Sequence, residues 1–355
     1  PINTMEKPQI IAHVQKSLNY TLYDCKWLPG TARFAVVGSH PRGTGALQMY
    51  EIAQRRCDQL NWTPKRPNLL NVAPLAPRYP VGVTWQLGIS MASYTYGMLT
   101  SRKCQLISVK AHQEIVNTRL MQLARARQKS PQDLGMALSE CGIPGSPMTP
   151  WPAWSRMIRL RLETAGCVAF GDAFNSTERC LVSGYDNGDL KLFDLRAMAL
   201  RWETNLKNGI CGLEFDRRDI PANKLVASTL EGKFHVFDMR TQHPNKGFAS
   251  LTERAHKSTV WCARHLPQNR DVFMTCGGSG GLCLWQYSYP TARVAKDSDG
   301  LDYGVAGTVA LLQNVTLSTQ PVASFDWSPD KLGLGICASF DQCLRVLIVT
   351  KLNRL

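Results

Sequence analysis

The chain alternates short apolar runs with segments in which apolar and polar side chains take turns. Leu190 and Leu192 flank one polar residue, and Phe234 and Val236 repeat this pattern further along. A period of two places the apolar side chains on one face of a β-strand. A tight turn precedes each alternating segment, as at residues 186–188 (Asp-Asn-Gly), where the residue types tolerate positive φ. Each unit therefore predicts a β-hairpin with one buried face.

This hairpin unit recurs along the second half of the chain, and a further short strand precedes each copy. Phe193, Phe237 and Trp285 close three of the hairpins, and Leu347 takes that place in the fourth. The first 56 residues repeat the same unit. The four hairpins span residues 180–194, 224–238, 272–285 and 334–347. Repeats of 40 to 50 residues with several short strands each are typical of a β-propeller.

We expect residues 1–355 to form one all-β WD-repeat propeller with seven blades. Residues 1–56 hold a closure strand and blade one, and residues 167–355 hold blades four to seven with an insertion at 287–318. The closure strand, Ile10–Gln15, should pair with the last blade at Asp341–Val349. We place Trp27 and Trp327 in the core, because they end apolar strands.

Residues 57–166 are aberrant, basic and rich in proline, and they stand where blades two and three should be. They carry 13 Lys/Arg against 5 Asp/Glu, and half of the 20 prolines. Read in a shifted frame, the codons of Ile89–Met98 and Gly135–Ile143 allow WD-repeat hairpin sequences at the expected spacing. The alternative is a true insertion in a five-bladed propeller.

Composition and charge narrow the possible partners. The net charge is +14, but much of it falls in 57–166 and forms no organised basic face, which argues against a nucleic-acid partner. No apolar run is long enough to cross a bilayer and no secretory signal is visible, so we expect a cytoplasmic protein without a membrane partner. The 12 cysteines include no C-x-x-C pair, which predicts a reduced chain without a metal site.

No motif in the chain has the spacing of a catalytic or cofactor site. The glycine-rich stretch at 277–281 lacks the lysine of a P-loop and is better explained as a hairpin turn. We expect His256 to form a hydrogen bond within its own blade, and Asp186 and Asp341 to stabilise tight turns by Asx-type hydrogen bonds. The sequence therefore predicts a protein with no enzyme activity and no cofactor.

Several segments resemble Monad-type WD-repeat proteins, a family of dynein axonemal assembly factors. The resemblance is carried by EKPQIIAHVQK, SGYDNGDLKLFDLRAMALRWETN, LEGKFHVFDMRTQHPNKGFAS, AHKSTVW and LLQNVTLSTQP, and it covers residues 1–56 and 167–355. It implies a seven-bladed propeller in the cytoplasm, a monomer within a larger complex. The implied partners are a prefoldin-like co-chaperone complex and axonemal dynein heavy chains, which the family helps to fold before export to cilia. An involvement in apoptosis is also implied.

The function expected from these observations is a protein-interaction scaffold that presents a loop-lined face. The face should consist of the loop that enters each blade and the central turn of each blade. Aromatic and charged residues in these loops and turns are candidate anchors for a partner. The candidates are Tyr20, Tyr185, Lys207, Asn208, Lys257, Ser258, Trp261 and Gln320. Two alternatives remain open: a generic recognition propeller for modified histone tails or ubiquitin, and a nucleic-acid binder.

The frameshift hypothesis predicts that the transcript differs from the printed sequence in its reading frame. Reads across codons 57–166 should reveal compensating insertions or deletions, or misplaced exon borders, near codons 57, 107, 118 and 166. Sequencing of cDNA measures this directly. Clean reads that translate as printed would reject the hypothesis in favour of a true insertion.

Overall fold

The structure is a computed structural model in which strands form nearly all of the regular elements. The residues it describes are 7–41, 45–53, 61–62, 165–172, 179–197, 199–217, 220–296 and 300–354. Blades two and three, expected within 57–166, lie outside the described residues; of this range only 61–62, in the last strand of blade one, and 165–166, at the start of blade four, are described.

The described fold consists of five four-stranded antiparallel sheets, each of which is one blade, and one two-stranded sheet. Blade one comprises β2 (Thr21–Trp27), β3 (Arg33–Ser39), β4 (Gly45–Ala53) and β5 (Asn61–Trp62). Blade four comprises β6 (Ala165–Gly171), β7 (Cys180–Tyr185), β8 (Asp189–Asp194) and β9 (Ala199–Asn205). Blade five comprises β10 (Ile210–Phe215), β11 (Lys224–Thr229), β12 (Lys233–His243) and β13 (Gly247–Arg254).

The last two sheets complete this set. Blade six comprises β14 (Val260–Leu266), β15 (Asn269–Gly277), β16 (Gly281–Ser288) and β19 (Thr308–Thr316). Blade seven comprises β20 (Val322–Trp327), β21 (Leu334–Ser339), β22 (Cys343–Val349) and, from the other end of the chain, β1 (Ile10–Ser17). All four hairpins that the sequence predicts are present.

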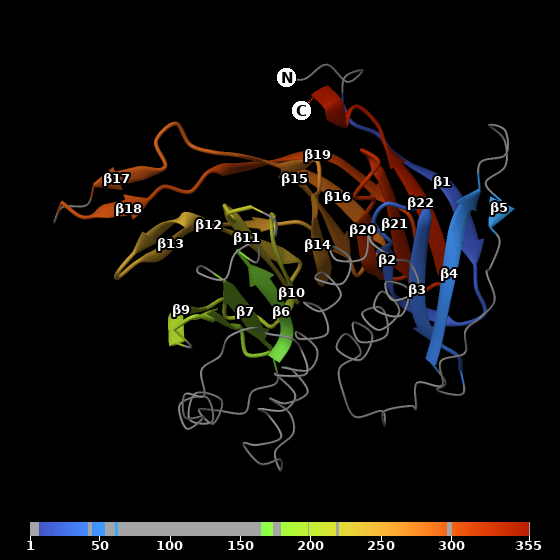
Figure 1. The fold of residues 1–355 in the computed structure, drawn as a ribbon, viewed down its shortest axis with the longest axis horizontal. Helices are drawn as coiled ribbons and strands as arrows, with labels where there is room; N and C mark the ends of the chain where they lie inside the picture. The colour runs from blue at the N-terminus through green and yellow to red at the C-terminus, as the bar shows by residue number, and fades with distance from the viewer. Residues whose placement is uncertain are drawn as a thin grey trace, which may run out of the picture.

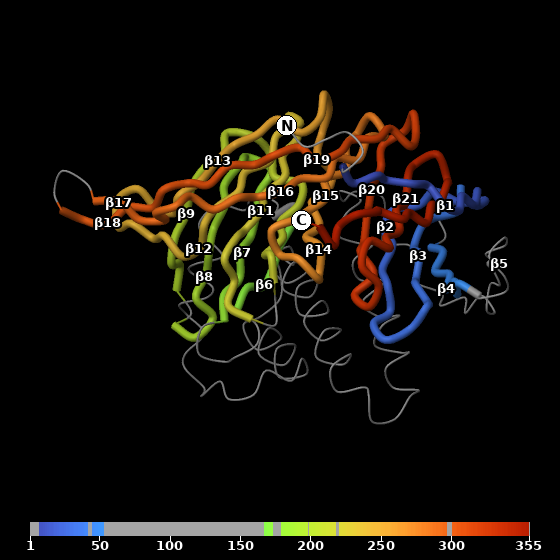
Figure 2. The backbone as a smooth tube through the Cα atoms, turned by 90° about the horizontal axis from the view of Figure 1, so that it is seen from above, coloured from blue at the N-terminus to red at the C-terminus, as the bar shows by residue number. Residues whose placement is uncertain are grey.

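The blades stand side by side in an arc, in the order four, five, six, seven, one (Figures 1 and 2). The first strand of each blade lies against the first strand of the next, from β6 through β10, β14 and β20 to β2. Sheets set radially around their first strands define a β-propeller. The predicted fold class is therefore confirmed.

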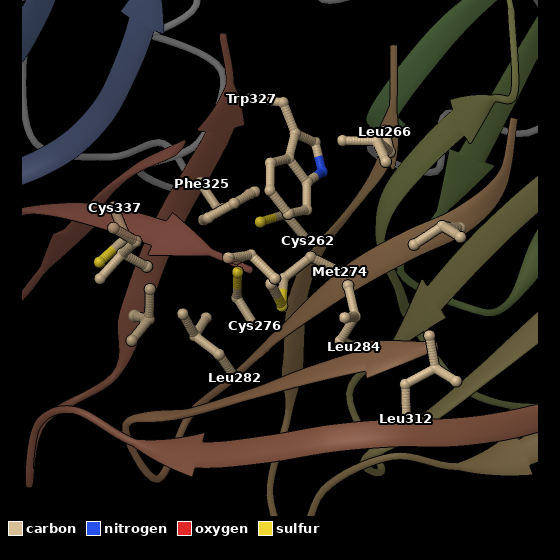
Figure 3. Close-up of a cluster of buried hydrophobic side chains, with 14 of the residues drawn as sticks. Cys262, Leu266, Met274, Cys276, Leu282, Leu284, Leu312, Phe325, Trp327 and Cys337 are labelled. Carbon is tan, nitrogen blue, oxygen red and sulfur yellow. The ribbon is translucent and has the colours of Figure 1, made fainter. Parts of the chain in front are cut away.

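Apolar side chains from neighbouring sheets form the core between blades. Leu282 and Leu284 on β16 pack in one cluster with Phe325 and Trp327 of blade seven (Figure 3). The two tryptophans assigned to the core are buried, with 6% of Trp27 and 3% of Trp327 exposed. Where two described blades meet, the facing apolar side chains of each sheet are thus buried by its neighbour.

Polar groups on the first strands tie blades to each other. Glu214 of blade five accepts the backbone N–H of His265 in blade six at 2.7 Å, and the Arg264 guanidinium lies 3.5 Å from the same carboxylate. Asp326 of blade seven accepts the N–H of Trp27 in blade one at 2.9 Å and pairs with the Lys26 ammonium at 3.0 Å. The same arrangement of acid, amide and cation therefore joins two pairs of blades.

A strand from the N-terminal part completes blade seven, as the sequence predicts. β1 pairs antiparallel with β22, from Ile10 opposite Val349 to Ser17 opposite Cys343. The Arg345 guanidinium donates a hydrogen bond to the Gln15 side chain at 3.3 Å. This pairing covers an edge strand that would otherwise be open.

The insertion expected at 287–318 is shorter than predicted. β19 pairs with β16 throughout and is the outer strand of blade six. The extra segment forms a two-stranded arm, β17 (Val294–Lys296) and β18 (Asp302–Gly304), which reaches past blade five (Figure 1). The Arg293 guanidinium fixes the arm, since its Nε donates to Asp238 on β12 at 3.0 Å. The chain ends in a short 3₁₀ helix, η1 (Leu352–Arg354).

Deleting residues 1–16 should destabilise the protein. The variant loses most of the β1–β22 ladder, and we expect a loss of about 5 kcal/mol, or roughly 10 °C in melting temperature. The exposed edge of β22 should also promote aggregation. Differential scanning calorimetry and light scattering measure both effects. Deleting residues 1–6 is the control, and equal melting curves for the two deletions would contradict the role of β1.

Candidate functional site

One face of the arc is a continuous band of loops and turns, which we call the top face. It consists of the loops that lead into each first strand and the turns between the second and third strands. The Leu206 N–H donates to the Gly188 carbonyl at 2.8 Å, and the Leu230 N–H donates to Gly209 at 3.0 Å. Equivalent bonds link Gly278 to Thr259, Leu317 to Gly280, Phe340 to Pro321 and Leu18 to Gln342. Turn and loop therefore alternate as hydrogen-bonded neighbours from blade four to blade one.

Each first strand is irregular at the end nearest this face. The register shifts past one residue in all five strands, and those residues are Tyr23, Gly166, Cys211, Trp261 and Ala323. A bulge of this kind redirects the side chain of the extra residue. The sequence gives no sign of it, because the apolar pattern continues on both sides.

Two bulge residues and one turn residue form an aromatic row across three blades. The Trp261 ring meets the Phe340 ring edge to face at a centroid distance of 5.4 Å, and Tyr23 meets Phe340 at 5.9 Å. All three side chains are half-buried. The row is therefore held by mutual packing while part of each ring stays accessible.

Seven of the eight predicted binding residues reach the surface of the top face. Lys207, Lys257 and Gln320 are exposed, and Tyr185, Asn208, Ser258 and Trp261 are half-buried. Lys207 adopts a left-handed conformation with φ of 63°, and its N–H donates to the Asn205 side chain at 2.7 Å. That hydrogen bond fixes the direction in which the lysine leaves the loop.

Tyr20 is a correction to the predicted face. Its side chain is 0% exposed. Its hydroxyl donates to Gln48 at 3.2 Å, and its ring lies 5.4 Å from that of His40. Tyr20 is thus a core residue of blade one and is not available to a partner.

His256 takes the structural role that the sequence predicts. Its Nε2 lies 3.0 Å from the Thr275 hydroxyl, which also accepts the Trp285 indole N–H at 3.0 Å. Burial lowers the pKa of His256, although the hydrogen bond to Thr275 opposes this change. The histidine is therefore neutral near pH 7 and links the loop before β14 to Thr275 on β15, which in turn is bonded to Trp285 on β16.

Asp341 fixes the turn of blade seven. Its carboxylate accepts the Cys343 N–H at 3.0 Å, the Ser318 hydroxyl at 2.8 Å and the Arg345 guanidinium at 2.6 Å. Burial alone raises the pKa of this carboxyl, but these donors outweigh burial and lower it to about 2. In blade four the Asx hydrogen bond is made by Asn187, whose side chain accepts the Asp189 N–H at 2.8 Å, so the role predicted for the exposed Asp186 belongs to its neighbour.

Phe340, Tyr23 and Gly278 belong to this face and were missed at the sequence level. Phe340 directly precedes Asp341, which the sequence places in a turn. That position was the one sequence feature that could have assigned Phe340 to the top face. Within the described part of the chain, no cluster of three or more His, Cys, Asp or Glu side chains has a metal-binding arrangement. No helix among the described residues is long and apolar enough to cross a membrane.

Comparison with known proteins gives close relatives along the whole chain. Dynein axonemal assembly factor 10 of Xenopus laevis is 53% identical over 99% of both chains, and that of Homo sapiens is 50% identical over 100% of both. The Chlamydomonas reinhardtii protein is 44% identical over 99% of this chain and 100% of its own. No family model matches the chain.

Two solved structures are more distant. Chaetomium thermophilum Raptor is 16% identical with a TM-score of 0.38, covering 54% of this chain and 16% of its own. Sqt1 of the same organism is 14% identical with a TM-score of 0.38, covering 51% and 44%. The fold assignment therefore rests on the strand pairing itself.

The fold and its surface define a β-propeller protein with a hydrogen-bonded loop face. The near-full-length identity to the curated relatives then places it among them. The chain belongs to the dynein axonemal assembly factor 10 family.

Replacing Asp341 by Asn should reveal the stabilising role of this carboxylate. Because the folded-state pKa is depressed to about 2, the stabilisation is present above the unfolded pKa near 4 and is lost as the pH falls towards 2. We expect Asp341→Asn to reduce the free energy of unfolding by about 2 kcal/mol at pH 6, and this difference to shrink from pH 5 to pH 3.

Urea unfolding across this pH range measures the effect. Asp186→Asn is the matched control, because this exposed turn residue should change stability by less than about 0.5 kcal/mol. A constant difference between Asp341→Asn and the unsubstituted chain at every pH would contradict the assignment.

Proposed function

We propose that this protein is a non-catalytic scaffold in the assembly of axonemal dyneins. The observation that carries the proposal is the end-to-end identity of 44–53% with proteins named dynein axonemal assembly factor 10. The top face gives this role a physical basis, since it combines rigid backbone with accessible aromatic and charged side chains. The same identity favours an assembly role over tail recognition or nucleic-acid binding.

In this proposal the propeller acts by holding its loops in a fixed geometry. The hydrogen bonds between turns and loops remove backbone freedom from the top face before any partner arrives. A partner then loses less entropy on binding, because one of the two surfaces is already ordered. No bond is made or broken, so the contribution to assembly is positional.

The proposed partners are axonemal dynein heavy chains and a prefoldin-like co-chaperone complex in the cytoplasm, with one copy of this chain in the complex. The family resemblance supports these partners. On the surface we assign binding to the aromatic row of Tyr23, Trp261 and Phe340 and to the polar residues around it. Those residues are Tyr185, Lys207, Asn208, Lys257, Ser258 and Gln320.

The variant Lys257→Glu with Trp261→Ala should lose partners while keeping its fold. Trp261 is half-buried, so its truncation removes contact area from the row without opening the core. Aromatic anchors of this kind carry about 2 kcal/mol or more of binding, so recovery of dynein heavy chain and co-chaperone should fall at least about tenfold. Co-purification from ciliated-cell cytosol, with circular dichroism on the same preparations, measures this.

Lys296→Glu is the matched control, because it reverses an exposed charge on β17, outside the top face. The experiment is run on the chain as printed and on a version with the frame of 57–166 restored. Undiminished recovery by a folded double variant would reject the top face as the binding surface. Failure of both unsubstituted versions to recover either partner would reject the proposed function.

A further inference from the structure

A second polar surface lies where blade four meets blade five, at the end of these blades opposite the top face. Three exposed arginines lie there: Arg196 in the turn after β8, Arg201 on β9 and Arg240 on β12. Arg201 is the extra residue of a bulge, because the register of β8 with β9 passes from Trp202 directly to Leu200. A bulge turns the side chain of its extra residue out of the regular row. We call these three residues the arginine cluster.

Neutral amides hold two of the three guanidinium groups. The Arg201 Nε and Nη2 donate to the Gln242 side-chain oxygen at 3.2 and 3.0 Å, a contact that crosses from blade four to blade five. Two residues earlier on β12, the Arg240 Nε donates to the Asn223 side-chain oxygen at 3.2 Å. An arginine side chain carries five N–H donors, and both side chains are exposed, so donors remain for another acceptor. The amides therefore fix the direction of the two cations without neutralising their charge.

The acid beside the cluster does not balance its charge. The Asp194 carboxylate accepts the backbone N–H of Arg196 at 2.8 Å and that of Ala197 at 3.0 Å. The N–H of Ala197 lowers the pKa of this carboxyl most, and the N–H of Arg196 and the guanidiniums of Arg196 and Arg201 lower it further. In the part of the chain that the structure describes, no carboxylate forms an ion pair with any of the three arginines. Three cations and one nearby acid leave the cluster positive.

We propose that the arginine cluster binds an acidic segment of a partner protein, in which several Asp or Glu residues lie close together. Guanidinium groups match carboxylates in shape and bind them through charge-assisted hydrogen bonds. Since Gln242 and Asn223 already order two of the arginines, these side chains lose less freedom when the partner binds. The cations form one compact patch and not the longer row that follows a phosphate backbone, which favours a protein. This surface is separate from the top face, so one propeller can hold two partners.

Gln242→Glu tests the cluster, because it neutralises Arg201 without changing the size of the side chain that holds it. The glutamate forms an ion pair with the guanidinium, so an external carboxylate loses that partner. Binding of an acidic segment should weaken about tenfold, while the melting temperature stays unchanged or rises by about 1–3 °C. Gln9→Glu is the matched control, because it makes the same change of charge at an exposed glutamine before β1.

Arg240→Gln tests the second ordered cation. This change keeps a long polar side chain but removes the positive charge, and it should also weaken binding about tenfold. Arg254→Gln is its control, since Arg254 is an exposed arginine of the same blade at the other end of β13. Both variants lower the net charge by the same amount, so a difference between them depends on the position of the arginine and not on the total charge.

The probe is a fluorescein-labelled synthetic peptide of alternating Glu and Gly, and its counterpart has Gln in place of every Glu. Both are measured by fluorescence anisotropy against the full chain, at low and at physiological salt. We expect the acidic peptide to bind and the Gln peptide not to bind, with an affinity that falls as the salt concentration rises, because exposed charges are screened. Trp261→Ala should bind the acidic peptide as the unsubstituted chain does, since this tryptophan lies on the top face.

Three results would overturn the acidic-segment site. The first is equal binding of the acidic peptide and its Gln counterpart, and the second is an equal loss in each variant and its matched control. The third is tighter binding of a single-stranded DNA oligonucleotide that is lost in Gln242→Glu and Arg240→Gln, which would assign the cluster to a nucleic acid. None of these measurements uses dynein heavy chain or the top face, so the scaffold function is tested separately by co-purification.

Discussion

The contacts between first strands hold the rest of the structure in place. A blade is a small sheet with apolar side chains on both faces. It is stable only when a neighbouring blade covers each face. The apolar contact alone allows sliding, because it has no preferred register. Glu214 and Asp326 remove that freedom, since each accepts one defined N–H of the next blade and attracts the cation beside it. These bonds fix the relative height of blades five and six and of blades seven and one, and thus of their loops.

The regular arrangement of loops on the top face depends on these bonds between first strands. Once the first strands are fixed in height, the turn of each blade lies level with the loop that enters the next, and the hydrogen bonds between them can form. The aromatic row needs the same alignment, because Trp261, Phe340 and Tyr23 come from three blades. A shift of one residue between blades would separate these rings. Binding at this face should therefore be sensitive to changes in the packing between blades.

Sequence reasoning succeeded where the signal was local. The alternation at Leu190 and Leu192 predicts a strand, and both side chains are fully buried in β8. It failed for Tyr20, because a position at the start of a blade says nothing about the Gln48 and His40 side chains that cover it. The contact between Trp261 and Phe340 joins two repeats and depends on a bulge, so no short-range pattern encodes it. The sequence thus identified candidate residues from their positions in predicted loops and turns. Only the structure shows which of them lie together.

The same constraint bears on residues 57–166. Among the described strands, β6 and β2 stand at the two ends of the series of first strands, and each has a described first strand on one side only. A propeller closes when every first strand has two neighbours, so closure here requires sheets encoded between blade one and blade four. The match to the relatives runs from end to end in both chains, which leaves this range within the common length and not as added length. The frameshift hypothesis, in which a shifted frame restores two hairpins in this range, and a true insertion remain the two predictions that the transcript decides.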